Sequence, residues 1–193
     1  MTERYRRRNN LMRKGGSKQK GAANERLVCR QLSLWVTNGK REDIFWRSAM
    51  SGGRATVAKR KGVHLAAQSG DISSIDKQGH PLTEDFYIET KHVRDIALDR
   101  FILTGTGPLM RYWQTACREA RSYRKRPLLI IKQNLLPMIL LCRRGTVQAL
   151  TGGKLKVNKS AAIVHQSGCE IWLFDTVLAV PFNYQPVAVS SML

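Results

Sequence analysis

The chain has 193 residues, of which 42% are hydrophobic, and its 33 Lys and Arg against 14 Asp and Glu give a net charge of +19. This length predicts one domain with a core of its own, and the charge predicts a polyanionic partner, most commonly nucleic acid. No apolar run approaches 18 residues and no basic helix has a broad apolar face, so the sequence argues against a membrane protein.

The first twenty residues carry eight Lys and Arg against Glu3 alone. They predict a disordered basic arm over 1–20, which is either a solubilising tail or an arm that follows a phosphate backbone. A helix is predicted over 22–37, ended by Asn38-Gly39. Glu25 begins its apolar stripe of Val28, Cys29, Leu32 and Val36, and it either favours the helix N-terminus or reaches a site elsewhere.

A short β-prone run, Ile44–Arg47, precedes small residues and a dense basic cluster. The segment from Arg54 to Gln68 is interpreted either as a loop that approaches a sugar-phosphate backbone or as a plain exposed loop. Its cationic residues are Arg54, Lys59, Arg60 and Lys61.

Two β-prone runs between residues 70 and 93 flank a polar turn at 76–81, which predicts a β-hairpin. Antiparallel pairing about His80 would place Asp71 opposite Glu89, and the period of two puts Glu89 and Lys91 on the same face. Opposed carboxylates destabilise a sheet unless a cation lies between them. Mg²⁺, with Mn²⁺ as the alternative, suits such oxygen ligands, whereas the competing interpretation is an ordinary solvated Glu/Lys pair.

The second half predicts a helical turn within 94–107, a helix from Pro108 to about Lys125 and a fully buried central strand at Pro127–Ile131. Leu136–Cys142 follows as a strand, and Pro137 favours an edge position for it. Beyond residue 142 we expect a β-rich extension over 143–193, with short strands at Thr146–Leu150, Ile171–Phe174 and Val177–Val180.

The four cysteines are far apart and lack zinc-ligand spacing, and the four histidines form no cluster. We therefore expect free thiols in a reducing compartment. The N-terminal residues have positive charge without an apolar core segment, so we expect a cytoplasmic protein rather than an exported one.

The order of these elements resembles the PD-(D/E)XK nuclease core and, within that superfamily, the archaeal-type Holliday junction resolvases. The motifs that carry the resemblance are Lys20-Gly21-Ala22-Ala23-Asn24-Glu25-Arg26, Arg47-Ser48-Ala49-Met50-Ser51-Gly52-Gly53, and Asp71 with Ile88-Glu89-Thr90-Lys91. The resemblance covers roughly residues 20–132. It implies an α/β fold with a restriction-endonuclease-like core, a central mixed β-sheet flanked by helices. We expect one nuclease domain over 21–193, with its core at about 21–142.

The resemblance also implies roles for individual residues. It assigns Glu25, Asp71, Glu89 and the Thr90 carbonyl to a metal site, Lys91 to the attacking water, and Ser51 to a position beside the site. We expect DNA contacts from Arg26, Arg47, Arg54, Lys59, Arg60, Lys61 and Gln114.

These patterns together predict a divalent-metal-dependent DNA endonuclease, with branched DNA such as a four-way junction as substrate and a homodimer as the active form. A two-fold dimer would make the two matched incisions that a symmetric junction needs. Two alternatives stay open: an endonuclease of the same core acting on linear duplex, and a basic nucleic-acid-binding protein without enzymatic activity.

Overall fold

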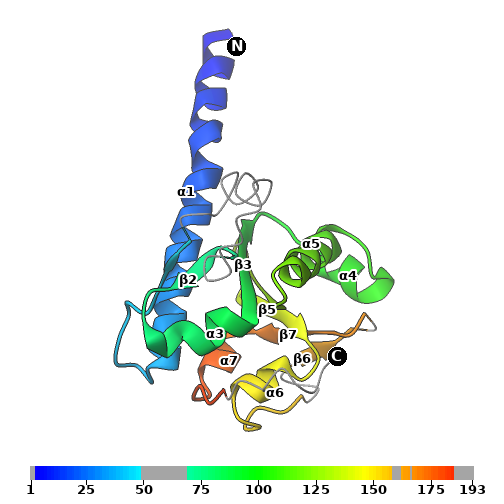
Figure 1. Ribbon diagram of the computed structural model, residues 1–193. Coiled ribbons are helices and arrows are strands. Elements are labelled where there is room, and N and C mark those ends of the chain that lie inside the picture. The colour runs from blue at the N-terminus through cyan, green and yellow to red at the C-terminus, as the bar shows by residue number, and fades with distance from the viewer. Residues whose placement is uncertain (1–2, 49–68, 158–161, 166, 185–193) are drawn as a thin grey trace.

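The computed structural model describes residues 3–48, 69–157, 162–165 and 167–184 (Figure 1). The helices and strands follow in this order: α1 (Glu3–Val36), β1 (Phe45–Arg47), β2 (Ile72–Ser74), the 3₁₀ turn η2 (Lys77–Gly79), α3 (His80–Asp85), β3 (Phe86–Val93), α4 (Leu98–Thr104), α5 (Pro108–Ser122), β4 (Arg126–Gln133), β5 (Met138–Arg143), α6 (Thr146–Leu150), β6 (Ala162–Val164), β7 (Cys169–Leu173) and α7 (Phe174–Leu178).

The main sheet has five strands in the order β3-β4-β5-β7-β6. Strands β3 and β4 are parallel, and the remaining neighbours are antiparallel. β4 lies between β3 and β5, and its residues Leu128 to Ile131 are all buried, as expected for an apolar run without alternation. The predicted central mixed sheet flanked by helices is therefore confirmed.

Two hydrophobic cores cover the two faces of this sheet. On one face α1 packs with Val28 and Leu32, among others, against residues such as Ile88 and Trp172 of the strands. On the other face α5 buries Leu109 and Trp113. Figure 1 shows α1 and the α4–α5 pair on opposite sides of β3. Helices therefore pack on both faces of β3, and its alternating side chains divide between the two cores.

The α5 helix forms where its sequence pattern predicts it. Pro108 occupies the first turn, where no amide hydrogen is needed. The predicted stripe of Leu109, Trp113, Ala116 and Ala120 is buried against the sheet, because spacings of three and four return each side chain to the same helix face.

The predicted hairpin between residues 70 and 93 is wrong. β2 pairs antiparallel with β1, and Arg47 lies opposite Ile72. The contact with β3 is a single parallel bridge between Gly70 and Ile88. The Asp76 carboxylate accepts from the Gln78 amide 2.9 Å away and starts the 3₁₀ turn. α3 then follows with Pro81 in its first turn, and this helical connection returns the chain parallel to its earlier direction, as helical crossovers do.

The N-terminal arm also differs from the prediction. α1 begins at Glu3 rather than near residue 22, so residues 3–20, where we expected a disordered arm, extend the helix. The physical reason is that Arg, Lys, Met and Leu are good helix formers, and each residue added to an existing helix gains one backbone hydrogen bond. In the part of the chain that the structure describes, no helix combines the length and apolarity that a membrane crossing requires.

Three predictions for the C-terminal half are corrected. β5 is an interior strand between β4 and β7, because Pro137 precedes its first residue and removes no ladder hydrogen bond. Residues 146–150 form the helix α6 instead of a strand, and the strand predicted at 177–180 begins inside the helix α7. Short apolar runs of this length do not distinguish helix from strand, so the described residues after 142 contain both helices and strands.

Candidate active site

Three hydrogen bonds hold Asp71 in place, two of them to β3 and one to Ser48, the residue after β1. The Asp71 amide donates to the Ile88 carbonyl, and the Ser48 amide donates to the Asp71 carbonyl, both at 2.8 Å. The Thr90 amide donates to Oδ2 of the Asp71 carboxylate, also at 2.8 Å. The carboxylate is therefore fixed beside the residue pair Glu89 and Thr90, although the chain reaches it by a parallel bridge rather than by a hairpin.

Gly70 makes this close approach feasible. Its φ of +85° is in the left-handed region, and a Cβ atom there would lie 2.5 Å from the Ile88 carbonyl oxygen. Any side chain at residue 70 would push Asp71 away from β3.

Gly70→Ala is therefore expected to destabilise the protein more than Gly39→Ala does. Gly39 has a φ of +83° but open space around its Cβ position, so its substitution costs only backbone strain of about 1 kcal/mol. The steric clash at residue 70 adds about 1–3 kcal/mol. Urea unfolding monitored by circular dichroism gives both values. Equal losses for the two variants would show that the contact with Ile88 is not tight.

Glu89 lies on β3 between a cation and a phenol. Lys91 Nζ forms an ion pair with the Glu89 carboxylate, and the Tyr87 hydroxyl donates to Oε2 of Glu89 at 3.2 Å. Tyr87 is itself stacked on Tyr123, with ring centroids 5.9 Å apart. The predicted common face of Glu89 and Lys91 is observed, and Tyr87 shares it. The role of Tyr87 was missed, although its position two residues before Glu89 on the same strand face was a usable signal.

Glu25 extends from α1 toward the same region and forms an ion pair with Arg47 of β1. Its side chain is 15% exposed. The charge of Glu25 contributes to the pKa shifts of both Asp71 and Lys91. Because α1 begins at Glu3, Glu25 does not lie at a helix N-terminus, and its assignment to the site stays a prediction.

The pKa of Asp71 is raised to about 7, first by burial and then by the negative charge of Glu89, while Lys91 and the Thr90 amide oppose the shift. For Lys91, burial alone would lower the pKa, but the Glu89 carboxylate outweighs it and the net direction is upward. Lys91 therefore stays charged at neutral pH. A charged ammonium cannot remove a proton from water, so this residue is suited to donating hydrogen bonds and to stabilising negative charge.

The fit of a divalent ion depends on the carboxylates of Asp71 and Glu89. Among residues 3–48, 69–157, 162–165 and 167–184, no group of three or more His, Cys, Asp or Glu side chains is arranged as a metal site. Mg²⁺ needs less than that, because it retains several waters and binds through one or two carboxylates. The pKa of Asp71 is raised first by burial and then by the charge of Glu89, so an ionised Asp71 carboxylate is unfavourable here, and a bound divalent cation would offset that cost.

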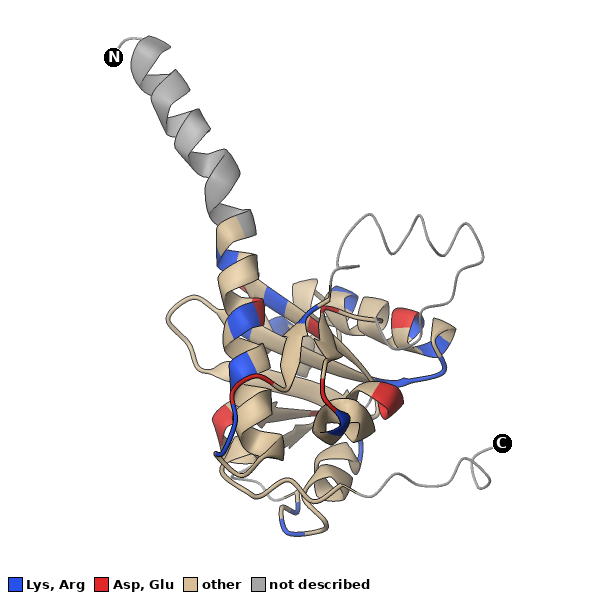
Figure 2. Ribbon diagram, turned by 60° about the vertical axis from the view of Figure 1, so that its left-hand side comes forward, with Lys and Arg blue, Asp and Glu red and all other residues tan. Residues whose placement is uncertain are grey.

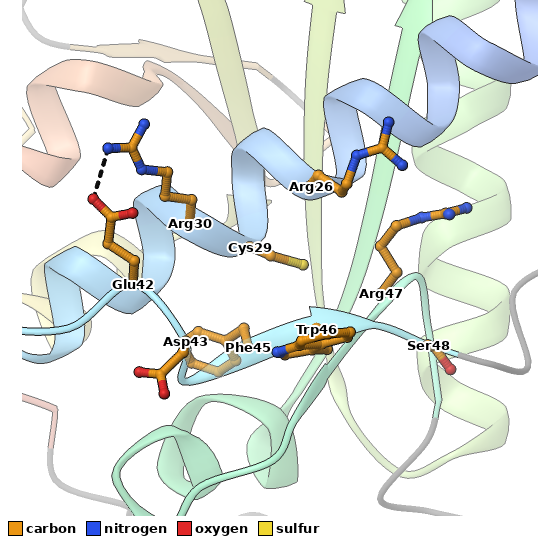
Figure 3. Close-up of a pocket in the computed structure, with 9 residues that line it drawn as sticks. All are labelled: Arg26, Cys29, Arg30, Glu42, Asp43, Phe45, Trp46, Arg47 and Ser48. Atoms are coloured by element: carbon orange, nitrogen blue, oxygen red, sulfur yellow. Dashed lines mark hydrogen bonds and ion pairs between the residues drawn. The ribbon is translucent and has the colours of Figure 1, made fainter.

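The other predicted residues are distributed as follows. Arg26 and Arg47 line a cavity between α1 and β1 (Figure 3). Gln114 is an exposed residue of α5. Ser51 and the basic residues Arg54, Lys59, Arg60 and Lys61 lie outside the described residues. Figure 2 shows that Lys and Arg positions recur along the coloured part of α1, the helix that carries Arg26.

A protein-family model described as a phage putative PDDEXK endonuclease matches residues 16–177. The match spans Glu25, Asp71, Glu89 and Lys91 and continues through β7 into α7. It therefore includes most of the C-terminal segment in which the sequence alone offered no family signal. No protein among the curated ones and no solved structure matches the chain.

Proposed function

Because the chain belongs to this family of phage putative PDDEXK endonucleases, we propose that it is a divalent-metal-dependent DNA endonuclease that hydrolyses phosphodiester bonds. The observation that supports the proposal most directly is the meeting of Asp71 with the Glu89–Lys91 pair, in which the Thr90 amide binds the Asp71 carboxylate at 2.8 Å. A carboxylate with a raised pKa beside a fixed cation is typical of catalytic sites.

In this proposal Asp71, Glu89 and the Thr90 carbonyl would hold the metal, with Glu25 as a further ligand. A bound Mg²⁺ would supply an activated water and stabilise the charge that develops on the phosphate. Lys91 would donate a hydrogen bond to the attacking water and stabilise the same charge. Tyr87 positions Glu89 through its 3.2 Å hydrogen bond, and Arg47 positions Glu25 through their ion pair.

Four-way junction DNA is the substrate that we propose for this activity, with a homodimer as the active form. The net charge of +19 supports a polyanionic substrate. The sequence resemblance to archaeal-type junction resolvases supports branched over linear DNA, and a two-fold dimer supplies two matched active sites. An enzyme for linear duplex is the direct competitor.

Cleavage of a labelled four-way junction and of its parent duplex tests the proposal. With Mg²⁺ we expect paired, symmetric nicks in the junction arms and at least about 100-fold slower cleavage of the duplex, a difference of roughly 2.7 kcal/mol in the barrier. EDTA should stop cleavage and leave binding intact. Glu89→Gln, purified in parallel, shows that no contaminating nuclease is responsible.

Equal rates on both substrates would replace the junction with duplex DNA as the substrate. Binding without cleavage in Mg²⁺ or Mn²⁺ would overturn the enzymatic proposal and favour a basic binding protein.

A further inference from the structure

A cavity of about 700 Å³ opens between α1 and β1, beside the candidate active site. Its lining residues come from these two elements and the turn between them: Arg26, Cys29, Arg30, Glu42, Asp43, Phe45, Trp46, Arg47 and Ser48 (Figure 3). Two of them connect it to the active site. Arg47 pairs with Glu25, and the Ser48 amide binds the Asp71 carbonyl at 2.8 Å. A group bound in this cavity would therefore lie next to the proposed metal ligands.

The cavity has an aromatic wall, Trp46, that stays largely exposed among the residues that the structure describes. Trp46 is 61% exposed, whereas its neighbours Phe45 and Cys29 are buried at 2% and 5% exposure. Trp46 lies on β1 opposite Ser73, so its indole ring contributes little to the core. A large exposed aromatic ring over an apolar floor is typical of a surface that stacks a planar ligand.

The charges around the cavity favour an anion at its end near the active site. Figure 3 shows the guanidinium groups of Arg26 and Arg47 extending in the same direction, away from the acidic residues. The acids are neutralised locally: Glu42 pairs with Arg30 at 2.6 Å, and Asp43 binds Arg41 at 2.9 Å. A phosphate at this end of the cavity thus meets Arg26 and Arg47, of which Arg47 is also paired with Glu25, and no uncompensated acid among the lining residues.

We propose that this cavity binds one unpaired nucleotide of the DNA substrate, with its base stacked on Trp46 and its phosphate at Arg26 and Arg47. The proposal rests on the proposed function in that it places this nucleotide beside the phosphodiester to be cut. An aromatic platform next to arginines is the combination that binds single-stranded nucleotides. A base inside duplex DNA is stacked and paired, so only an unpaired or extruded base could enter. Paired DNA would contact the protein through its phosphates.

The test compares two DNA probes of identical sequence, one fully paired and one with a single unpaired 2-aminopurine. All proteins carry Glu89→Gln and are kept in EDTA, so binding is measured without cleavage. Against this background we compare Trp46→Ala, Trp46→Phe and the control Ile75→Ala. Ile75 is 62% exposed and lies just after β2, outside the cavity lining.

For Trp46→Ala we expect the affinity for the unpaired probe to fall by about 5–100-fold, the equivalent of one base–aromatic stack. This loss should exceed the loss for the paired probe at least fivefold. Trp46→Phe should restore most of the affinity and of the 2-aminopurine quenching. Arg26→Gln should weaken binding of both probes and reduce the salt dependence.

Equal losses for the two probes, or a loss for Ile75→Ala as large as for Trp46→Ala, would overturn the proposal. Unchanged affinity and quenching in Trp46→Ala would also overturn it. Thermal melts identify a variant that fails to fold. If Trp46→Ala fails to fold, the affinities of Trp46→Phe and Arg26→Gln for the two probes still separate stacking from charge. Failure of the proposed function is distinguishable, because it would show as absence of cleavage in Mg²⁺ while this binding comparison still gives its answer.

Discussion

Asp71→Asn is expected to abolish DNA cleavage and, in the absence of metal, to make the protein more stable. The two effects have one cause. Burial and the charge of Glu89 raise the pKa of Asp71 to about 7, so the ionised carboxylate is unfavourable in the folded protein unless a cation compensates it. Asparagine keeps an oxygen that can accept the 2.8 Å hydrogen bond from the Thr90 amide but carries no charge.

The sign of the stability effect follows from the direction of this pKa shift. The pKa of Asp71 in the folded protein, about 7, exceeds the ordinary value of 3.8 for an aspartate, so the folded state binds the extra proton between these pH values. Its contribution to stability is fully present below pH ~4 and is lost as the pH rises through ~7. Asp71→Asn removes that loss. We expect a gain of about 2 kcal/mol at pH 8, or roughly 4–8 °C in Tm, and no gain near pH 4.

Thermal unfolding of the two proteins in EDTA at pH 4 and pH 8 measures the effect. Addition of Mg²⁺ at pH 8 should raise the Tm of the wild type and leave that of the variant nearly unchanged, since metal binding to the folded state stabilises it. Cleavage by the variant should fall at least about 10³-fold, a loss of roughly 4 kcal/mol of transition-state stabilisation.

Asp76→Asn is the matched control. Asp76 belongs to the same segment, but the Gln78 amide and Arg41 lower its pKa, so its removal should destabilise the protein rather than stabilise it. If Asp71→Asn behaved like Asp76→Asn, the carboxylate of Asp71 would be stabilised in the folded state, and the argument for an uncompensated charge would fail.

Local patterns were sufficient to predict several elements and the common face of two candidate site residues. The stripe from Leu109 to Ala120 fixed α5, and the apolar run of β4 fixed a buried strand, because each pattern reports burial directly. The alternation in β3 placed Glu89 and Lys91 on one face for the same reason. Each of these features depends only on residues that are near one another in the sequence.

Long-range pairing could not be predicted in the same way. Asp71 and Glu89 do meet, but through a parallel bridge at Gly70 and Ile88, since β2 pairs with β1 instead. The turn residues at 76–81 are compatible with a tight hairpin and equally with the start of a helical connection. The choice depends on packing: residue 79 is surrounded so closely that a Cβ there would lie 2.7 Å from Phe45 and 2.8 Å from Ile44.

The partners of site residues were also outside the reach of sequence patterns. Glu25 and Arg47 are 22 positions apart in different elements, and nothing local links them. Trp46 was one residue in a short strand, and its exposure depends on what β1 packs against. The burial of β1 residues and the cavity beside this strand result from the way α1 packs over β1, which local sequence does not show.

Lys91→Met is expected to lower the cleavage rate about 10²–10³-fold, the usual cost of one group that stabilises transition-state charge. The pKa of Lys91 is raised by Glu89 despite the opposing effect of burial, so the side chain is a cation at every pH near neutrality. Methionine keeps the apolar stem and removes only the ammonium group. The loss should therefore appear in kcat and change little with pH between 7 and 9.

Mg²⁺ affinity distinguishes this role from a structural one. The Lys91 ammonium forms an ion pair with the Glu89 carboxylate in the metal-free protein. Its removal frees this carboxylate for the metal, so the Mg²⁺ affinity measured by calorimetry should stay equal or become tighter. Lys40→Met, at an exposed residue after α1, controls for the loss of one positive charge. Weaker Mg²⁺ binding together with lost cleavage would show that Lys91 maintains the site. Tighter Mg²⁺ binding together with lost cleavage would assign Lys91 to the reacting phosphate. In that case the Lys91 ammonium would compete with the metal for Glu89 before the reaction and would help only when negative charge develops in the transition state.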